Sequence, residues 1–262
     1  MVTLTTWPWW VLLPLSLVVV LGITFGAKRL LTHFFGADSG SAVTTAGPLM
    51  TGFGALFAFL SAFVIATEWS TQTTADAAVA REAAASARLA WASTAAGVGT
   101  DAVQGQLDEY LTRTIEVEWG EMANGRPVAA TESEPWRRLE QTTRIEAAAP
   151  GVSSPSTSEM LSALDDLASA RRERLDISSR ALPVPLFMIL GLSGLALCVN
   201  AAVLTIPHSP RTTVVAATII VVVALDLGLV LVLGAPFRGT LTASPDLLQG
   251  VQDGLRAGFF RL

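Results

Sequence analysis

Long apolar stretches without charge alternate with polar, helix-forming stretches along this chain. Four stretches stay apolar over roughly 20 residues, which is the length of helix needed to cross a bilayer core. Asp226 is the only charged side chain within them. The pattern therefore predicts four transmembrane helices, over about residues 7–26, 49–67, 184–206 and 212–237.

The order of the spans places two membrane hairpins around a polar middle. The first span is predicted to be retained, because no basic residue precedes it and Lys28 and Arg29 follow it, where a signal peptide would have small residues for cleavage. Both termini and the polar middle then share one side of the membrane. The predicted parts are a first hairpin over 1–67, an extramembrane helical domain over 68–182, a second hairpin over 183–237 and a C-terminal tail over 238–262.

The basic residues near the spans give two answers about the side that the domain faces. Lys28 and Arg29 follow the first span, and this places the domain outside the cell. The total count favours a cytosolic domain, because only Lys28, Arg29 and Arg211 lie on the other side. The side therefore stays open for a multipass protein expected in the plasma membrane. The arginines on the domain side are Arg81, Arg171, Arg172, Arg174, Arg180 and Arg238.

The polar middle is predicted to be helical throughout. The chain is rich in Ala from residue 68 to Gly97, and no Pro follows Pro48 in this stretch. One helix of about 40 residues or more, roughly 60 Å long, is therefore expected to run through the membrane and beyond it. Further helices are predicted from Asp101 as the N-cap, from Ser133, and from residues 157–158 to 182. Because no strand pattern occurs, the predicted fold class is all-α.

The composition excludes several classes of protein. The chain of 262 residues is 51% hydrophobic and 15% charged, whereas soluble domains carry about 25% charged residues. A single cysteine, Cys198, excludes a disulfide framework and Cys-based zinc sites, and no metal or other cofactor is predicted. The net charge of −5 gives no reason to expect nucleic-acid binding. Since no catalytic motif is visible either, we expect a membrane protein that is not an enzyme.

Several short motifs follow one another in a fixed order along the chain. Each is weak alone, but their order and spacing together are more specific. They are GFGALFAFLSAFVIAT at 52–67, AREA at 80–83, Tyr110 with EWGEM at 118–122, ARRERL at 170–175 with Leu182-Pro183, and PFRG at 236–239 with Ser244-Pro245.

On these motifs the chain resembles the bestrophin-like domain family of bacterial membrane proteins, over nearly its whole length. It departs from the expected pattern at Gly234-Ala235, where a more polar pair is expected, and in the weakly charged loop 27–48. The resemblance implies a remote relationship to bestrophins, which are oligomeric anion channels with four spans per subunit and long helical extensions. It thus implies a homo-oligomer, a pentamer by resemblance, with an inorganic anion as its ligand.

The second span presents two different faces. Small residues recur every four positions, a pattern that lets helices approach closely: Gly54, Ala58, Ala62 and Ala66. Bulky residues form a second stripe, and these are the pore-lining candidates: Phe53, Phe57, Leu60 and Val64. This bulky stripe either forms a hydrophobic constriction that gates a pore by dewetting or fills the helix bundle.

Further polar and small residues are candidates for function. Asp226 lies within the fourth span, where a charge costs about 2.5–3.5 kcal/mol on insertion scales, so it must face a partner, and Asn200 of the third span is the expected one. The interpretation is either a structural hydrogen bond or ion handling. The other candidates are Arg81 and Arg88 at a pore mouth, and Gly22 and Gly26 for helix packing.

Two functions remain open at this point. The first is an oligomeric ion channel, with anions favoured by the family resemblance. The second is a non-conducting membrane scaffold or accessory subunit, which docks a partner through the acidic domain over 68–182, where 11 basic and 18 acidic residues give a net charge of −7. An anion path needs basic residues at its mouth, so Arg81 and Arg88 are the residues that separate the two functions.

Overall fold

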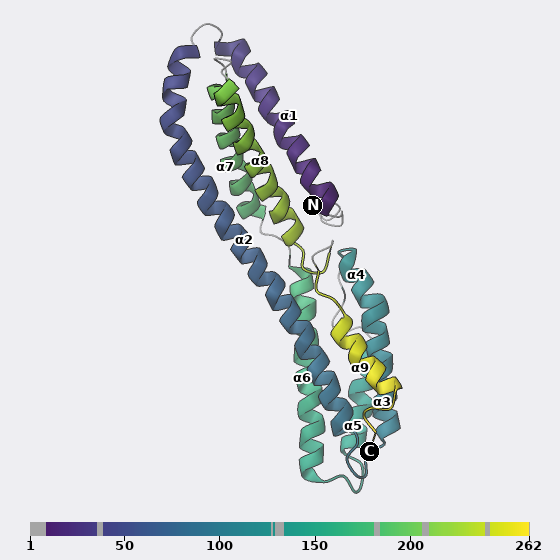
Figure 1. Ribbon diagram of the computed structural model, residues 1–262. Helices are drawn as coiled ribbons and strands as arrows, with labels where there is room; N and C mark the ends of the chain where they lie inside the picture. Colours follow the sequence, from purple (N-terminus) through teal and green to yellow (C-terminus); the bar gives the residue numbers. More distant parts are fainter. Residues whose placement is uncertain are drawn as a thin grey trace. The chain divides into compact units, whose positions relative to one another are not determined.

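The structure is a computed structural model that describes residues 9–35, 39–126, 128, 134–180, 184–205, 210–238 and 242–261. Within these ranges it contains helices and no strand, which confirms the all-α fold class. The helices in chain order (Figure 1) are α1 (Trp9–Phe35), α2 (Ser39–Ala92), α3 (Thr100–Arg113), the π-helix η1 (Thr114–Glu118), α4 (Trp119–Ala123), α5 (Glu134–Ala147), α6 (Ser154–Ser179), α7 (Val184–Leu204), α8 (Pro210–Leu233) and α9 (Asp246–Arg256).

The chain folds into two compact units. The membrane unit contains residues 1–70 and 181–235, and the helical unit contains residues 71–180 and 236–262. Four helical stretches of the described chain are long and apolar enough to cross a membrane, and they include α1, α2, α7 and α8. The prediction of four membrane-spanning helices is therefore confirmed.

α2 is one continuous helix of 54 residues, about 80 Å at 1.5 Å per residue. A helix of this kind was expected after Pro48, but it begins earlier, at Ser39, and contains Pro48. Neighbouring helices in a membrane bundle accommodate such a proline. The Ala-rich segment contains no helix breaker, so α2 continues to Ala92, and Gly97 with a φ of 86° lies in the turn that follows.

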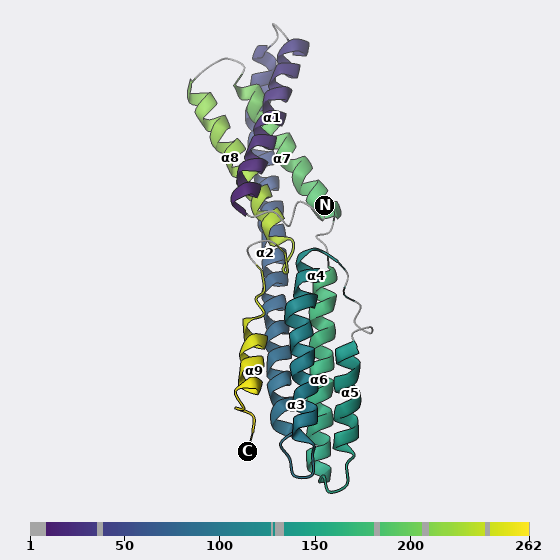
Figure 2. The ribbon, with the colours of Figure 1, turned by 90° about the vertical axis from the view of Figure 1, so that its right-hand side faces the viewer.

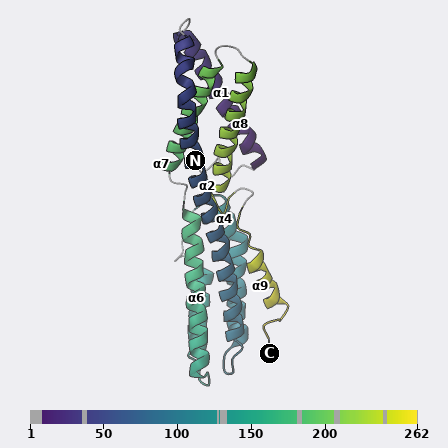
Figure 3. The same cartoon turned by 60° about the vertical axis from the view of Figure 1, so that its left-hand side comes forward.

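α1, α7 and α8 pack against one another in the membrane unit (Figure 3). α1 and α8 approach closely where Gly228 lacks a side chain. A Cβ at Gly228 would stand 2.7 Å from the Leu13 Cδ2 and 2.8 Å from the Ser16 Oγ. The Ser16 hydroxyl also donates a hydrogen bond to the carbonyl oxygen of Ala224 at 2.9 Å. This contact fixes α1 against α8 in register.

α3, α5 and α6 lie side by side in the helical unit (Figure 2), with α3 against α5 and α5 against α6. α6 begins at Ser154, earlier than the predicted start at 157–158, because Ser153 is its N-cap and accepts a hydrogen bond from the Ser156 amide. The core draws on every long helix of the unit. Its fully buried side chains include Leu89, Leu107, Leu139, Met160 and Leu167.

α3 begins one residue before the predicted N-cap. Its N-cap is Gly99 rather than Asp101, and the Gly99 amide donates to Glu146 Oε2 at 2.8 Å. Asp101 lies in the first turn and pairs with Arg261 at 3.0 Å. Glu146 of α5 thus binds the amide of the N-cap residue itself.

α9 lies in the segment that was predicted as a C-terminal tail. It packs on α3, with Leu248 and Leu255 buried. Its Gln252 amide donates to the Thr112 Oγ1 at 2.7 Å, and Arg256 pairs with Asp108 at 2.9 Å. The C-terminal segment is thus a part of the helical unit.

Candidate functional site

The bulky stripe of α2, predicted to line a pore, lies inside the membrane unit. Phe57 and Val64 are 3% and 2% exposed and pack in one apolar cluster with residues of α7 and α8. Phe53 and Leu60 are half-buried against the same cluster. A pore between copies of the chain is lined by surface residues, so the pore-lining prediction is corrected for Phe57 and Val64. Their side chains fill the close-packed bundle, which was the alternative interpretation.

The opposite face of α2 is exposed. It carries Phe59 and Phe63, which are 70% and 52% exposed. Three members of the small-residue stripe, Ala58, Ala62 and Ala66, are exposed as well, whereas Gly54 is half-buried. The two aromatic rings are spaced four residues apart and therefore lie on one side of the helix. This exposed face of α2 is open to lipid or to another chain.

Asp226 has a different partner from the one expected. The Ser61 hydroxyl of α2 donates to the Asp226 Oδ2 at 3.0 Å, and Asp226 is half-buried. Asn200 of α7 instead donates to the backbone carbonyl of Ala46 at 2.9 Å. The expected pair of Asp226 and Asn200 is thus wrong, because both side chains turn towards α2. The hydroxyl and the carboxylate join α2 to α8.

The helix-packing role expected of Gly22 and Gly26 is not seen within the membrane unit. A Cβ at either position would have no atom within 4 Å, and the same is true of Gly54. Close packing occurs instead at Gly194, where a Cβ would stand 3.1 Å from the Phe57 ring, and at Gly228. A spacing motif does not show which side of a helix meets a neighbour, so these two glycines were missed.

The pore-mouth candidates Arg81 and Arg88 are exposed but carry ion pairs. Arg81 pairs with Glu173 of α6 at 2.6 Å. Arg88 pairs with Glu159 at 2.7 Å and also with Asp166. The positive charge of both side chains is thus balanced locally, and neither is a free cation for an anion.

A cluster of charged residues that was not predicted from the sequence lies inside the helical unit. Glu82 of α2, Glu118 of η1, and Arg171 and Arg174 of α6 are each at most 2% exposed. The Arg174 Nε lies 2.5 Å from Glu82 Oε2, and its Nη2 lies 2.9 Å from Glu118 Oε2. Arg171 Nη2 lies 2.8 Å from Glu118 Oε1. Two acids and two bases balance in this buried charge cluster, as burial requires.

Tyr110 borders the buried charge cluster. Its hydroxyl, in a fully buried side chain, donates a hydrogen bond to Glu82. Burial raises the pKa of Tyr110 well above its usual value, and the nearby Glu82 carboxylate raises it further. The guanidinium groups lie over aromatic rings, with Arg171 at 5.8 Å from the Tyr110 ring and Arg174 at 5.4 Å from the Trp119 ring. Aromatic faces thus cover the parts of the cations that carboxylates leave free.

Glu118 reaches the buried charge cluster from a π-helical turn. In η1 the Trp119 amide bonds to the carbonyl of Thr114, five residues earlier. A π-turn holds an extra residue, and such turns often occur at functional sites. Thr114, Glu118 and Met122 stay on the buried side at four-residue spacing. The π-turn is therefore a means by which the chain directs Glu118 inwards.

The chemistry available in these sites is limited to charge and hydrogen bonding. Among the residues that the structure describes, no group of three His, Cys, Asp or Glu side chains is placed to hold a metal ion. The acids of the buried charge cluster are all engaged with arginine or tyrosine. This arrangement supports a structural role for the cluster.

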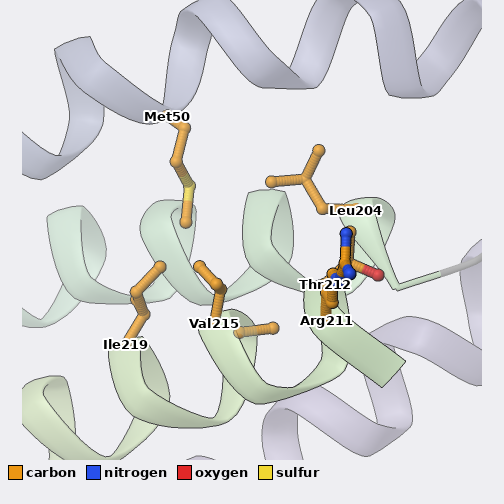
Figure 4. A pocket seen from close by; sticks show the side chains of 7 residues that line it. Met50, Leu204, Arg211, Thr212, Val215 and Ile219 are labelled. Carbon is orange, nitrogen blue, oxygen red and sulfur yellow. The ribbon is translucent and has the colours of Figure 1, made fainter. Parts of the chain in front are cut away.

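An apolar cavity of about 170 Å³ lies in the membrane unit. Met50 of α2 and Leu204 of α7 face residues from the first turns of α8 across it, as Figure 4 shows. Nothing in the sequence pattern pointed to this cavity. The residues from α8 are Arg211, Thr212, Val215, Ala216 and Ile219.

Comparisons with known proteins agree with this architecture. The family model of the Bestrophin-like domain matches residues 15–248. A bacterial bestrophin homologue from Klebsiella pneumoniae with a point mutation is 14% identical, with a TM-score of 0.68, and the match covers 94% of this chain and 98% of that chain. A second mutant of this homologue is 13% identical, with a TM-score of 0.65, and the match covers 93% of this chain and 99% of that chain. A mutant of a protein described as a membrane protein is 13% identical, with a TM-score of 0.67, and the match covers 94% of this chain and 97% of that chain. No curated protein matches. Because the sequence identity is only 13–14%, the solved structures show a shared fold alone.

Proposed function

Because this chain is a multipass membrane protein that belongs to the bestrophin-like domain family, we propose that it assembles with copies of itself into an ion channel. α2 lies beside the pore in this proposal. The observation that supports it most is the exposed face of α2. The bulky stripe of the same helix is already used inside the membrane unit, so the exposed face is the one available to a pore.

The exposed face of α2 combines two kinds of side chain that a channel needs. Phe59 and Phe63 are large and apolar, and a ring of such side chains from several copies forms a hydrophobic constriction that gates by dewetting. Ala58, Ala62 and Ala66 are small, which lets another helix approach closely. Pore residues and assembly residues are therefore neighbours on one helix.

An anion is the proposed ion, on the resemblance to bestrophins. The ion pairs of Arg81 and Arg88 weigh against strong anion selectivity at a mouth formed by these residues. The half-buried Asp226 of α8 accepts a hydrogen bond from Ser61 of α2. An ionised Asp in the path would repel an anion, so we place Asp226 off the pore.

The second candidate is a non-conducting scaffold, which the same ion pairs favour. A docking domain needs an exposed charged surface rather than a conducting path. Residues 68–182 carry a net charge of −7, and their arginines at 81 and 88 are compensated. A basic partner segment is the occupant that fits this surface.

Reconstitution in planar bilayers separates the two functions. We expect purified protein under asymmetric chloride to give currents that reverse near the chloride potential, and Phe59→Ala to raise the conductance by opening the constriction. Leu192→Ala is the matched control. Leu192 lies on another helix, α7, and its exposed fraction of 68% is similar to the 70% of Phe59. An intact oligomer without current would contradict the channel proposal, and equal effects of the two variants would contradict the placement of Phe59 beside the pore.

The assembly has its own test. Native mass spectrometry in detergent is expected to show a homo-oligomer, with five copies if the resemblance extends to stoichiometry. Ala62→Trp should dissociate it, because a large ring on the small-residue stripe keeps a neighbouring helix away. A monomer at every protein concentration would contradict both the oligomer and the channel. Fractionation of the host cell is expected to place the protein in the plasma membrane.

A further inference from the structure

We propose that the cavity lined by Met50, Leu204, Arg211, Val215 and Ile219 is a binding site for an anionic phospholipid. One acyl chain lies along the apolar wall, and the headgroup phosphate lies at Arg211. The site belongs to the membrane unit, and it does not depend on conduction.

The size and lining of the cavity fit part of a hydrocarbon chain. Its volume is about 170 Å³, below the roughly 300–1,000 Å³ of pockets that enclose compact small molecules. Met50 and Leu204 form one wall, and Val215 and Ile219 form the other (Figure 4). A site that is narrow, apolar and within a membrane span is filled by a flexible chain rather than by a polar solute.

Arg211 supplies the charge that selects the headgroup. It is exposed at the edge of the cavity, and no ion pair to it is found in the part of the chain that the structure describes. This differs from Arg81 and Arg88, whose charges are compensated by α6. A guanidinium that forms no ion pair with the described residues and lies beside an apolar wall matches a phosphate attached to an acyl chain.

The start of α8 strengthens the same preference. α8 begins at Pro210 and has no acidic residue in its first turn. The positive end of the helix dipole therefore adds to the charge of Arg211. These charges favour a headgroup with net negative charge over a zwitterionic one.

Native mass spectrometry with added lipid tests the site. We expect the wild-type protein to retain phosphatidylglycerol about fivefold better than phosphatidylcholine, the effect of one arginine at a membrane surface. Arg211→Gln should remove the preference, because it removes the charge. Val215→Trp should lower retention of both lipids, because the indole fills the cavity, and Val215 is exposed so that the fold is kept. Arg29→Gln is the matched control and should behave as wild type.

Several outcomes would overturn the proposal. Equal retention of the two lipids by the wild type would remove the headgroup preference. Loss of preference in Arg29→Gln as large as in Arg211→Gln would assign it to the general charge of this end instead. Thermal stabilisation by inorganic phosphate alone, equal to that by the lipid, would indicate an anion site without a chain. Channel activity does not enter any of these readouts, so failure here leaves the proposed function untouched.

Discussion

Replacing Arg174 by Met should destabilise the protein far more than any exposed arginine substitution. Arg174 holds Glu82 through two hydrogen bonds and Glu118 through one, and all three side chains are at most 2% exposed. Met is similar in length but carries no charge. The variant leaves Glu82 buried with only Tyr110 as a donor, because Arg171 reaches Glu118.

The size of the effect follows from burial. Removing one partner of a buried ion pair costs about 3–5 kcal/mol, since an uncompensated charge remains inside. For a unit of this size, 1 kcal/mol shifts the midpoint of thermal unfolding by about 3 °C, so Arg174→Met should lower it by roughly 10 °C or more.

The assay is thermal loss of helical circular dichroism from the full chain in detergent, at one scan rate because melting of such proteins is often irreversible. Arg81→Met is the matched control, because the pair of Arg81 and Glu173 is 2.6 Å apart but 55% and 33% exposed. Exposed pairs contribute about 0–1 kcal/mol, so this control should shift the midpoint by no more than about 3 °C.

A double variant completes the test. Glu82→Gln combined with Arg174→Met removes the stranded charge, and it should recover a coupling energy of about 1–3 kcal/mol relative to the sum of the single variants. A shift for Arg174→Met as small as that for Arg81→Met would refute the reasoning. Additive effects in the double variant would show that the two side chains act independently.

Three further predictions concern single contacts. Tyr110 is the only tyrosine in the sequence, and burial, followed by the neighbouring Glu82 carboxylate, raises its pKa. The contribution of the protonated Tyr110 to stability should therefore be fully present below about pH 10 and be lost above it. Tyrosinate absorbance should appear together with the loss of helix and not before. Ser61→Ala should cost about 1 kcal/mol by removing the donor to Asp226, measured as a lower melting midpoint in detergent; no change would contradict a structural role for this bond. Gly228→Leu should prevent stable packing of the membrane unit, whereas Gly22→Leu should be tolerated, and protease resistance in detergent compares the two.

Local sequence signals were sufficient for the lengths of the helices but not for their contacts. α2 was expected because nothing breaks the helix up to Gly97, and Pro48 misled only on where it begins. α9 was not predicted, because the polar residues in this segment are typical of a solvent-exposed tail. Its apolar residues do have helical spacing: Leu247, Leu248, Val251 and Leu255. A short amphipathic helix is stable only when its apolar face packs on another surface, so its sequence pattern alone does not predict it.

Contacts between membrane helices depend on rotation about the helix axis, which hydropathy does not define. The second span is apolar on every side, so the bulky and small stripes could be identified, but not which one faces the bundle. The same limit explains the wrong partner for Asp226. Ser61 is one polar residue in an apolar span, and its place on the same side as Phe57 and Val64 follows only from packing.

The buried charge cluster gives a physical reason for the motifs that carried the family resemblance. AREA, EWGEM and ARRERL supply Glu82, Glu118, Arg171 and Arg174, and these meet although they are up to 92 residues apart. Charged residues on a helix usually face solvent, so the motifs by themselves indicate a family resemblance and no structural role. Yet the sequence held a signal, because the apolar face of α6 continues through the two arginines at alternating spacings of four and three: Met160, Leu164, Leu167, Arg171 and Arg174.

That spacing changes how such a helix is interpreted. An arginine at a position that the helix buries must bring its own counter-charge, because an unpaired charge inside costs several kcal/mol. Two arginines on the buried face of α6 therefore require two acids from other helices, and each acid must itself lie on an apolar face. Glu82 meets this condition because Val79 and Leu89 are buried on the same side of α2. Glu118 meets it through the π-turn. Charge balance on buried faces thus predicts long-range partners where hydropathy alone predicts none.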